Sequence, residues 1–89
     1  MRDDRFEWDD GKAASNLRKH GISFEDAKSV FDDPAGFDED DADPNEERWK
    51  RTGLSARGLL VVVHAERGSR IRIISARRAT RHEQDSYNR

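Results

Sequence analysis

The sequence predicts an α+β domain, in which a small antiparallel sheet packs two N-terminal helices on one face and is followed by a short C-terminal helix. Three observations predict this class. Apolar residues recur at helical spacing only in the first third of the chain, two strand-like runs joined by a turn fill residues 58–78, and a capping signal opens a helix at residue 80. With 89 residues, 33% of them hydrophobic and 40% charged, the chain forms one domain over residues 1–89 with a thin core.

The chain begins with a strand and a helix. Residues 5–8 alternate polar and apolar side chains, which predicts a short edge strand. Asp9 and Asp10 then supply the N-cap of a helix over residues 11–20, and Gly21 ends it. The apolar side chains on one side of this helix are Ala13, Ala14 and Leu17.

A second helix starts at Ser23, which is an N-cap residue, and stops before Pro34. Its side chains at helical spacing are expected to face the sheet. They are Phe24, Ala27, Val30 and Phe31.

An acidic run follows over residues 32–47, with nine acidic residues and no basic one, which predicts a solvated loop with an edge strand around Phe37. The run is not an EF-hand. Glu46 stands where the calcium loop requires glycine, and Thr52 stands where it requires a bidentate glutamate. The three His are scattered, so the sequence predicts no metal site and no cofactor.

Residues 48–54 form another strand, and residues 58–78 form the central hairpin, with turn chemistry at Gly68. A two-residue turn would place on one face Leu60, Val62, His64, Ile71, Ile73, Ser75 and Arg77. It would place on the other face Leu59, Val61, Val63, Arg70, Arg72, Ile74, Ala76 and Arg78. A bulged turn would exchange these partners.

Thr80 and Glu83 make a capping box for a helix over residues 81–87. We expect the sheet face away from the helices to be a groove lined by Arg.

Charge divides the chain into two halves. Residues 1–47 hold 6 Lys/Arg and 16 Asp/Glu, net −10, whereas residues 48–89 hold 11 and 3, net +8. Ten of those eleven cations are Arg, the side chain suited to bidentate contact with phosphate, although two mutually neutralising halves would explain the pattern as well. The chain has no cysteine and no long apolar segment, which predicts a cytoplasmic protein without a membrane partner.

Several stretches resemble the BrnT family of toxins. They are Phe6-Glu7-Trp8-Asp9, Lys12, residues 16–27 (NLRKHGISFEDA), residues 30–33 (VFDD) and residues 71–80 (IRIISARRAT). The resemblance covers nearly the whole chain except the acidic loop at about residues 35–46.

The resemblance implies a RelE-like fold in the RelE/ParE-like superfamily and a ribonuclease that stops translation. It also implies a BrnA antitoxin with a ribbon-helix-helix domain, which neutralises the toxin and with it binds operator DNA to repress their promoter. Arg77 and Arg78 fall on the family's SxR motif at the end of the last strand, where related toxins keep a catalytic Arg. Tyr87 lies on the following helix, where several relatives keep an active-site aromatic. Related sheets also keep basic residues on preceding strands, which leaves Lys50 and Arg51 both open.

RNA cleavage without a metal needs activation of the 2′-hydroxyl, charge stabilisation at phosphorus and protonation of the leaving 5′-oxygen. We expect Arg77 to stabilise the charge, while Arg78, Arg72 and Arg70 hold the backbone. His64 is the only His on the hairpin and has suitable acid–base chemistry, but a structural His packed beside Val62 is an open alternative. Tyr87 and Lys19 are substitutes for proton transfer. The RNA-binding candidates are Arg70, Arg72, Lys50, Arg51, Arg81 and Lys19.

Two other functions fit the same residues. One is a non-catalytic module that binds nucleic acid or protein, in which the Arg-rich ribbon makes only salt-dependent phosphate contacts. The other is a ParE-like inhibitor of a topoisomerase, which would arrest DNA supercoiling without RNA loss.

Overall fold

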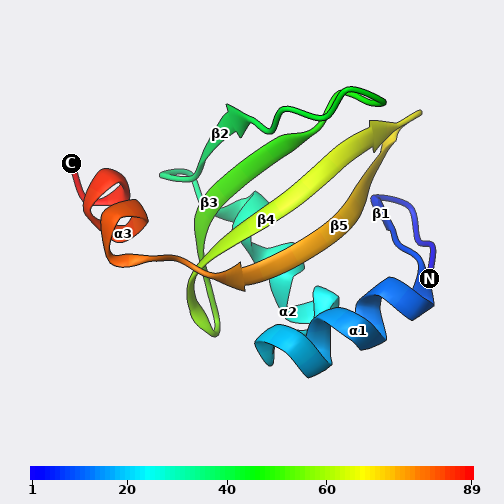
Figure 1. Cartoon of the computed structure of the whole chain (residues 1–89), viewed down its shortest axis with the longest axis horizontal. Coiled ribbons are helices and arrows are strands. Elements are labelled where there is room, and N and C mark those ends of the chain that lie inside the picture. Colours follow the sequence, from blue (N-terminus) through cyan, green and yellow to red (C-terminus); the bar gives the residue numbers. More distant parts are fainter.

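The computed structural model describes all 89 residues and contains one five-stranded sheet with helices around it (Figure 1). The strands are β1 (Phe6–Glu7), β2 (Phe37–Asp40), β3 (Trp49–Ser55), β4 (Gly58–Arg67) and β5 (Arg70–Arg78), in the order β1-β5-β4-β3-β2. The helices are α1 (Asp10–His20), α2 (Phe24–Ala27), the 3₁₀ helix η1 (Lys28–Asp32) and α3 (Arg81–Tyr87). The predicted α+β class is confirmed, but the five-stranded sheet is larger than the small antiparallel sheet that was predicted, and β1 runs parallel to β5. None of the helices has the length and apolar character needed to cross a membrane.

The helix ends lie close to where the local sequence signals predict them. The Asp9 side chain caps α1, and Gly21 follows it with φ of 69°, a conformation that glycine adopts without strain. Ser23 caps α2. Thr80 and Glu83 form the capping box that opens α3.

The second predicted helix is divided, because α2 gives way to η1 after four residues. Gly53 of β3 permits η1 to approach the sheet closely, since a Cβ at this position would lie 3.0 Å from Val30. The Arg51 side chain then satisfies the end of η1: its Nε donates to the Val30 carbonyl at 3.0 Å and its Nη2 to the Asp33 carbonyl at 3.2 Å. Arg51 therefore fastens η1 to β3.

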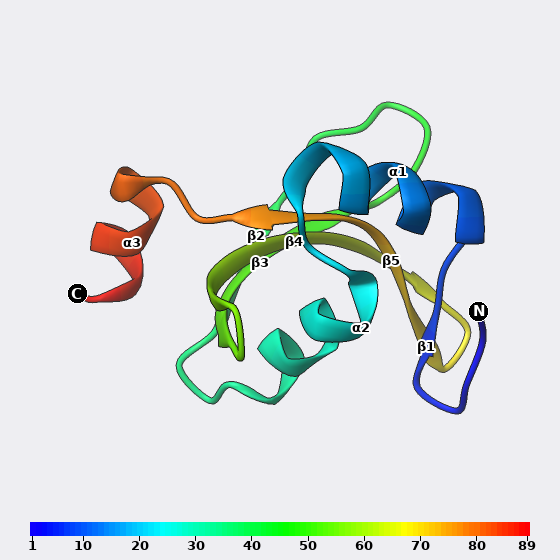
Figure 2. The ribbon, with the colours of Figure 1, turned by 90° about the horizontal axis from the view of Figure 1, so that it is seen from below.

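The position of α1 differs from the prediction that both N-terminal helices pack on one face. Figures 1 and 2 show α1 alongside the edge of β5, while α2 lies on the face of the sheet. β1 pairs with β5 only at Ile71 and Arg72, so the later backbone groups of β5 need another partner. Asn16 of α1 supplies it, because its Oδ1 accepts from the Ala76 amide at 3.0 Å and its Nδ2 donates to the Ala76 carbonyl at 2.8 Å.

The inner side of α1 is only partly as predicted, because Ala13 packs against the core whereas Ala14 and Leu17 are exposed. Asn16 is buried, whereas Leu17 is 51% exposed. Asn16 Nδ2 makes a further hydrogen bond to the Ile22 carbonyl at 3.0 Å, so one amide joins α1, the segment that precedes α2, and β5.

The hydrophobic core lies between the sheet and α2 with η1. Trp8 and Phe24 meet edge to face, with ring centroids 5.6 Å apart. The buried members of this core are Phe6, Trp8, Ile22, Phe24, Ala27, Val30, Leu60, Val62, Ile73 and Ala76.

A register shift in the central hairpin corrects the predicted facing of its C-terminal strand. Arg67 pairs with Arg70 across a two-residue turn, as one of the predicted alternatives requires. Between the Val63 and His64 pairs, however, β5 contains one extra residue, which is a β-bulge. Beyond the bulge Ala76 faces the core opposite Val62, and Arg77 lies opposite Val61 on the other face of the sheet. The prediction that Arg77 shares a face with His64 is therefore wrong.

We expect Asn16→Ala to lower the free energy of unfolding by about 2–4 kcal/mol, because three buried backbone groups lose their hydrogen-bond partner. Urea denaturation followed by circular dichroism measures this loss. Leu17→Ala is the matched control one position further along α1, and its side chain is half exposed, so it should cost about 0.5 kcal/mol or less. Equal losses in the two variants would contradict the role given to Asn16.

Candidate active site

Two rows of side chains cross the sheet on the face opposite the core. Strand pairing places partners on the same face, so the register defines both rows. The first row, from β2 to β5, is Phe37, Thr52, Val61 and Arg77. The second row is Glu39, Lys50, Val63 and Ser75.

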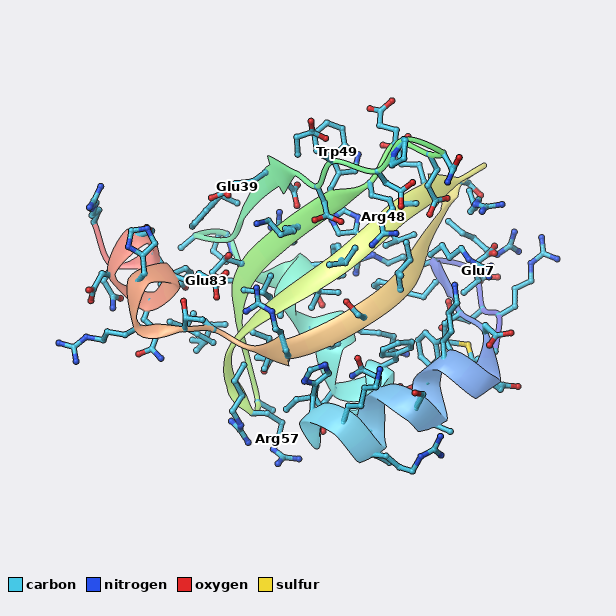
Figure 3. All side chains as sticks on the ribbon, viewed as in Figure 1. Glu7, Glu39, Arg48, Trp49, Arg57 and Glu83 are labelled. Atoms are coloured by element: carbon cyan, nitrogen blue, oxygen red, sulfur yellow. The ribbon has the colours of Figure 1, made fainter.

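A cavity of about 150 Å³ lies where α3 approaches these rows. Its residues come from β2, β3, β4 and α3, and Figure 3 labels Glu39 of β2 and Glu83 of α3 at this end of the sheet. They are Phe37, Glu39, Lys50, Thr52, Val61, His82, Glu83 and Ser86. Arg77 is adjacent to the cavity, because its cross-strand partner Val61 and its ion-pair partner Glu83 both line it.

Polar contacts near both ends of α3 hold the helix in this position. At its C-terminal end, the Tyr87 hydroxyl donates to Asp33 Oδ2 at 2.6 Å. At its N-terminal end, Arg77 Nη1 and Nη2 donate to the two Glu83 carboxylate oxygens at 2.8 and 3.0 Å. The two contacts fix the helix that forms one wall of the cavity.

The Arg77–Glu83 pair has a strong electrostatic effect. Hydrogen bonds from Arg77, helped by the Thr80 amide, lower the pKa of Glu83 from 4.5 to about 2, while Glu83 raises the pKa of Arg77. Both groups are therefore charged at neutral pH. The pair leaves the Nε hydrogen and one Nη2 hydrogen of Arg77 unused on one edge of the guanidinium, where an anion can bind.

Three further ionisable side chains of the cavity have no partner in the protein. Lys50, Glu39 and His82 form no ion pair and no side-chain hydrogen bond, and Lys50 is the only Lys among residues 48–89. An ammonium, a carboxylate and an imidazole thus line one small space beside an Arg. This combination supplies hydrogen-bond donors, an acceptor and a proton-transfer group.

His64 lies apart from this cavity, on the core face of the sheet. It is 7% exposed, its ring meets the Phe31 ring edge to face at 4.8 Å, and its Nε2 lies 3.2 Å from Asp38 Oδ1. Burial lowers the pKa of His64 despite the nearby Asp38 carboxylate. The structure does not bring His64 together with Arg77.

Lys50 and Arg51, which the sequence left open, point to opposite faces. Lys50 lines the cavity, whereas Arg51 lies on the core side and binds the carbonyls at the end of η1. Tyr87 does not line the cavity either. Its hydroxyl is bound to Asp33, which raises the pKa of Tyr87 and keeps the hydroxyl protonated.

None of the three cavities in the structure is lined by Arg, as the predicted groove would be. Of the eleven cations in residues 48–89, seven form ion pairs with carboxylates, so the acidic half neutralises much of the basic half.

Among the predicted RNA contacts, Arg72 pairs with Glu7 and Arg81 with Asp85. Arg70 donates to the Asp3 carbonyl and Arg78 to the Arg57 carbonyl. Lys19 lies in a separate shallow pocket between α1 and β5.

Sequence reasoning missed Glu39, His82 and Ser86 as members of the site. Glu39 was part of the acidic run interpreted as a solvated loop, and only the pairing of β2 with β3 brings it opposite Lys50. His82 and Ser86 are four residues apart, so they share one side of α3. That spacing is the sequence signal that identifies them.

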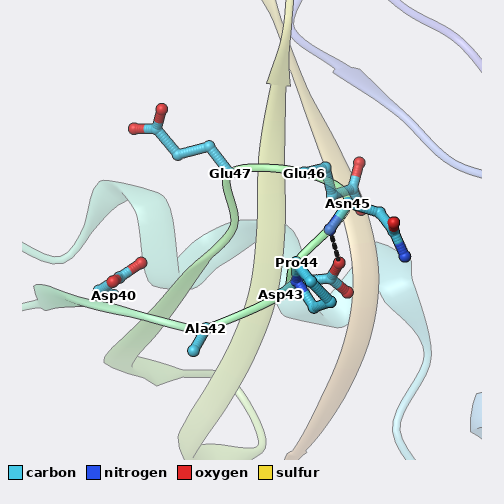
Figure 4. Close-up of a pocket in the computed structure, with 7 residues that line it drawn as sticks. All are labelled: Asp40, Ala42, Asp43, Pro44, Asn45, Glu46 and Glu47. Carbon is cyan, nitrogen blue, oxygen red and sulfur yellow. Dashed lines mark hydrogen bonds between the residues drawn. The ribbon is translucent and has the colours of Figure 1, made fainter.

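A second hollow is wider and more open, and it belongs to the acidic loop at residues 40–47 (Figure 4). The loop is organised internally: the Asn45 amide donates to Asp43 Oδ1 at 2.8 Å, and Arg48 forms ion pairs with Asp41 and Asp43. No three His, Asp or Glu side chains in the protein are grouped closely enough to hold a metal ion.

Comparison with known protein families identifies a match over most of the chain. The model of the family described as "Ribonuclease toxin, BrnT, of type II toxin-antitoxin system" matches residues 8–83, which include every strand except β1 and every cavity residue except Ser86. No curated protein sequence matches the chain significantly.

We expect Glu83→Gln to lower the free energy of unfolding by about 1–2 kcal/mol at pH 7, because the ionised carboxylate binds Arg77. The folded-state pKa of Glu83 is depressed, so this contribution is full above pH 4.5 and is lost as pH falls toward about 2. The difference between parent and variant in urea denaturation should therefore shrink from pH 7 to pH 3. Asp85→Asn, which removes the exposed partner of Arg81, should change stability little at any pH. A Glu83 effect that is constant with pH would exclude the charge as its cause.

Proposed function

The chain belongs to the BrnT family of ribonuclease toxins of type II toxin–antitoxin systems, and we propose that it cleaves RNA in the cavity between α3 and the sheet. The observation that carries this proposal is the position of Arg77. It lies at the end of β5, is held by Glu83, and borders a cavity with an unpaired lysine and an imidazole. Such a site can bind a phosphate and move a proton.

Arg77 stabilises the transition state in the proposed reaction. The 2′-oxygen attacks the adjacent phosphorus and the bond to the 5′-oxygen breaks, which leaves a 2′,3′-cyclic phosphate and a 5′-hydroxyl. Negative charge grows on the non-bridging oxygens as this occurs. The unused Nε and Nη2 hydrogens of Arg77 donate to those oxygens, and Glu83 keeps the guanidinium in place.

His82 is the proposed proton acceptor. It lies at the exposed rim of the cavity, where a ring nitrogen of its imidazole takes the proton of the 2′-hydroxyl. The leaving 5′-oxygen takes a proton from water, and the imidazolium returns its own to the solvent. The mechanism uses side chains alone and is metal-independent. His64 and Tyr87 have structural roles in this scheme, because they lie outside the cavity.

The antitoxin is proposed to cover the same cavity. Type II systems pair the toxin with a protein antitoxin, and a BrnA-like antitoxin with a ribbon-helix-helix domain is the candidate. An acidic or amphipathic segment of that protein would complement the unpaired Lys50. Through operator DNA held by the antitoxin, the complex would repress its own operon.

One observation favours a second function, a non-catalytic RNA-binding module. Glu83 already pairs with Arg77, which reduces the stabilisation that the guanidinium can give to the charge of a transition state. A binder of this kind would retain RNA without cutting it, and its affinity would fall steeply with salt.

We expect Arg77→Ala to reduce RNA cleavage by about 100-fold or more, because it removes the main donor to the phosphoryl oxygens. The assay incubates purified protein, free of antitoxin and with EDTA, with labelled single-stranded RNA. Arg57→Ala is the matched control, since Arg57 is exposed and pairs with Asp26 away from the cavity. Full cleavage by folded Arg77→Ala would refute its role, and intact RNA with the parent protein would favour the binding module.

Substitutions of His82 and His64 should have different effects in the same assay. His82→Gln should slow cleavage by about 100-fold or more at unchanged stability, because proton transfer is lost. His64→Gln should leave the rate per folded molecule unchanged and lower stability, since His64 is buried between Phe31 and Asp38. The reverse result, with cleavage dependent on His64, would move the active site to the other face of the sheet.

A further inference from the structure

Glu39 and Lys50 face each other across β2 and β3 and both line the cavity. Directly opposed side chains on neighbouring antiparallel strands have Cβ atoms about 5 Å apart, so this pair is positioned to form an ion pair. It forms none, and neither side chain hydrogen bonds to another residue. The cavity thus presents a carboxylate and an ammonium side by side, both free to bind a ligand.

The size and walls of the cavity restrict the ligand. Its volume of about 150 Å³ is below the roughly 300–1,000 Å³ of sites for drug-sized molecules, so it admits a fragment such as one nucleobase. Phe37 and Val61 contribute an aromatic ring and an apolar surface, which suit the flat face of a base. Arg77 lies just outside, where the phosphate attached to that nucleotide would be.

We propose that this cavity binds a guanine base of the RNA. The proposal rests on the ribonuclease function above and names the nucleotide that the site reads. The Glu39 carboxylate accepts hydrogen bonds from guanine N1–H and from its 2-amino group, and the Lys50 ammonium donates to O6.

The other three bases fit this pair less well. Adenine and cytosine present an unprotonated ring nitrogen on the Watson–Crick edge, which repels the carboxylate. Uracil offers a single N–H between two carbonyl groups, so it gives Glu39 one hydrogen bond instead of two. The bidentate contact of guanine is worth a discrimination of about 5- to 160-fold.

The test is binding, which is independent of cleavage. Isothermal titration calorimetry of the full chain, free of antitoxin, with guanosine, inosine and adenosine 3′-monophosphates compares three probes with the same sugar and phosphate. Guanosine 3′-monophosphate should bind about tenfold or more tightly than adenosine 3′-monophosphate. Inosine 3′-monophosphate lacks the 2-amino group, so its affinity should lie between the two. Glu39→Gln should reduce guanosine binding to the level of adenosine, whereas Glu47→Gln, on the nearby acidic loop outside the cavity, should leave the preference intact.

The outcomes separate the two proposals. Equal affinity for the three nucleotides, no measurable binding, or a preference that survives Glu39→Gln would overturn the guanine site, whatever the cleavage assay gives. Selective guanosine binding by a protein that leaves RNA intact would establish the guanine site and refute the ribonuclease. Selective binding together with cleavage beside guanines would support both.

Discussion

The bidentate contact of Asn16 with the Ala76 backbone is the constraint on which the rest of the structure depends. β1 pairs with β5 only at Ile71 and Arg72, and at Ala76 the Asn16 side chain supplies the hydrogen bonds that a neighbouring strand would otherwise make. The same contact holds α1 against this edge of β5. It also fixes β5 after the bulge, with Ala76 turned into the core. Because side chains alternate along a strand, Arg77 must then point to the opposite face. The position of the proposed catalytic Arg is therefore set by an amide on a distant helix.

Electrostatics in this chain act mainly within the fold. The acidic first half and the basic second half are joined by ion pairs such as Arg48 with Asp41 and Arg72 with Glu7. Most of these pairs are partly exposed, so each contributes modestly to stability. Their larger effect is to leave few cations free, and among these Lys50 is the one that lines the cavity. The charged side chains that remain unpaired therefore identify the site better than the net charge of either half does.

Much of the fold could be predicted from local signals, because helix caps and turns depend on neighbouring residues. Ser23, Gly21 and the capping box at Thr80 and Glu83 each mark a helix boundary that the structure confirms. The bulge in β5 and the edge position of α1 were missed, since both depend on contacts between segments far apart in sequence. The same reason applies to the site. Arg77 became a candidate through the SxR motif of the family that the chain resembles, but the pairing that brings Glu39 to Lys50 is not visible before the register is known.

The attachment of α3 affects how the cavity exchanges its contents with solvent. No residue of this helix is buried, so it adds little hydrophobic burial to the fold, and its main attachments are the Arg77–Glu83 and Tyr87–Asp33 contacts. A segment with so little buried surface detaches at a far smaller free energy than the sheet requires to unfold. The wall of the cavity can therefore swing away while the strands that carry Arg77 and Lys50 stay in register, so a long polymer can enter sideways instead of threading an end.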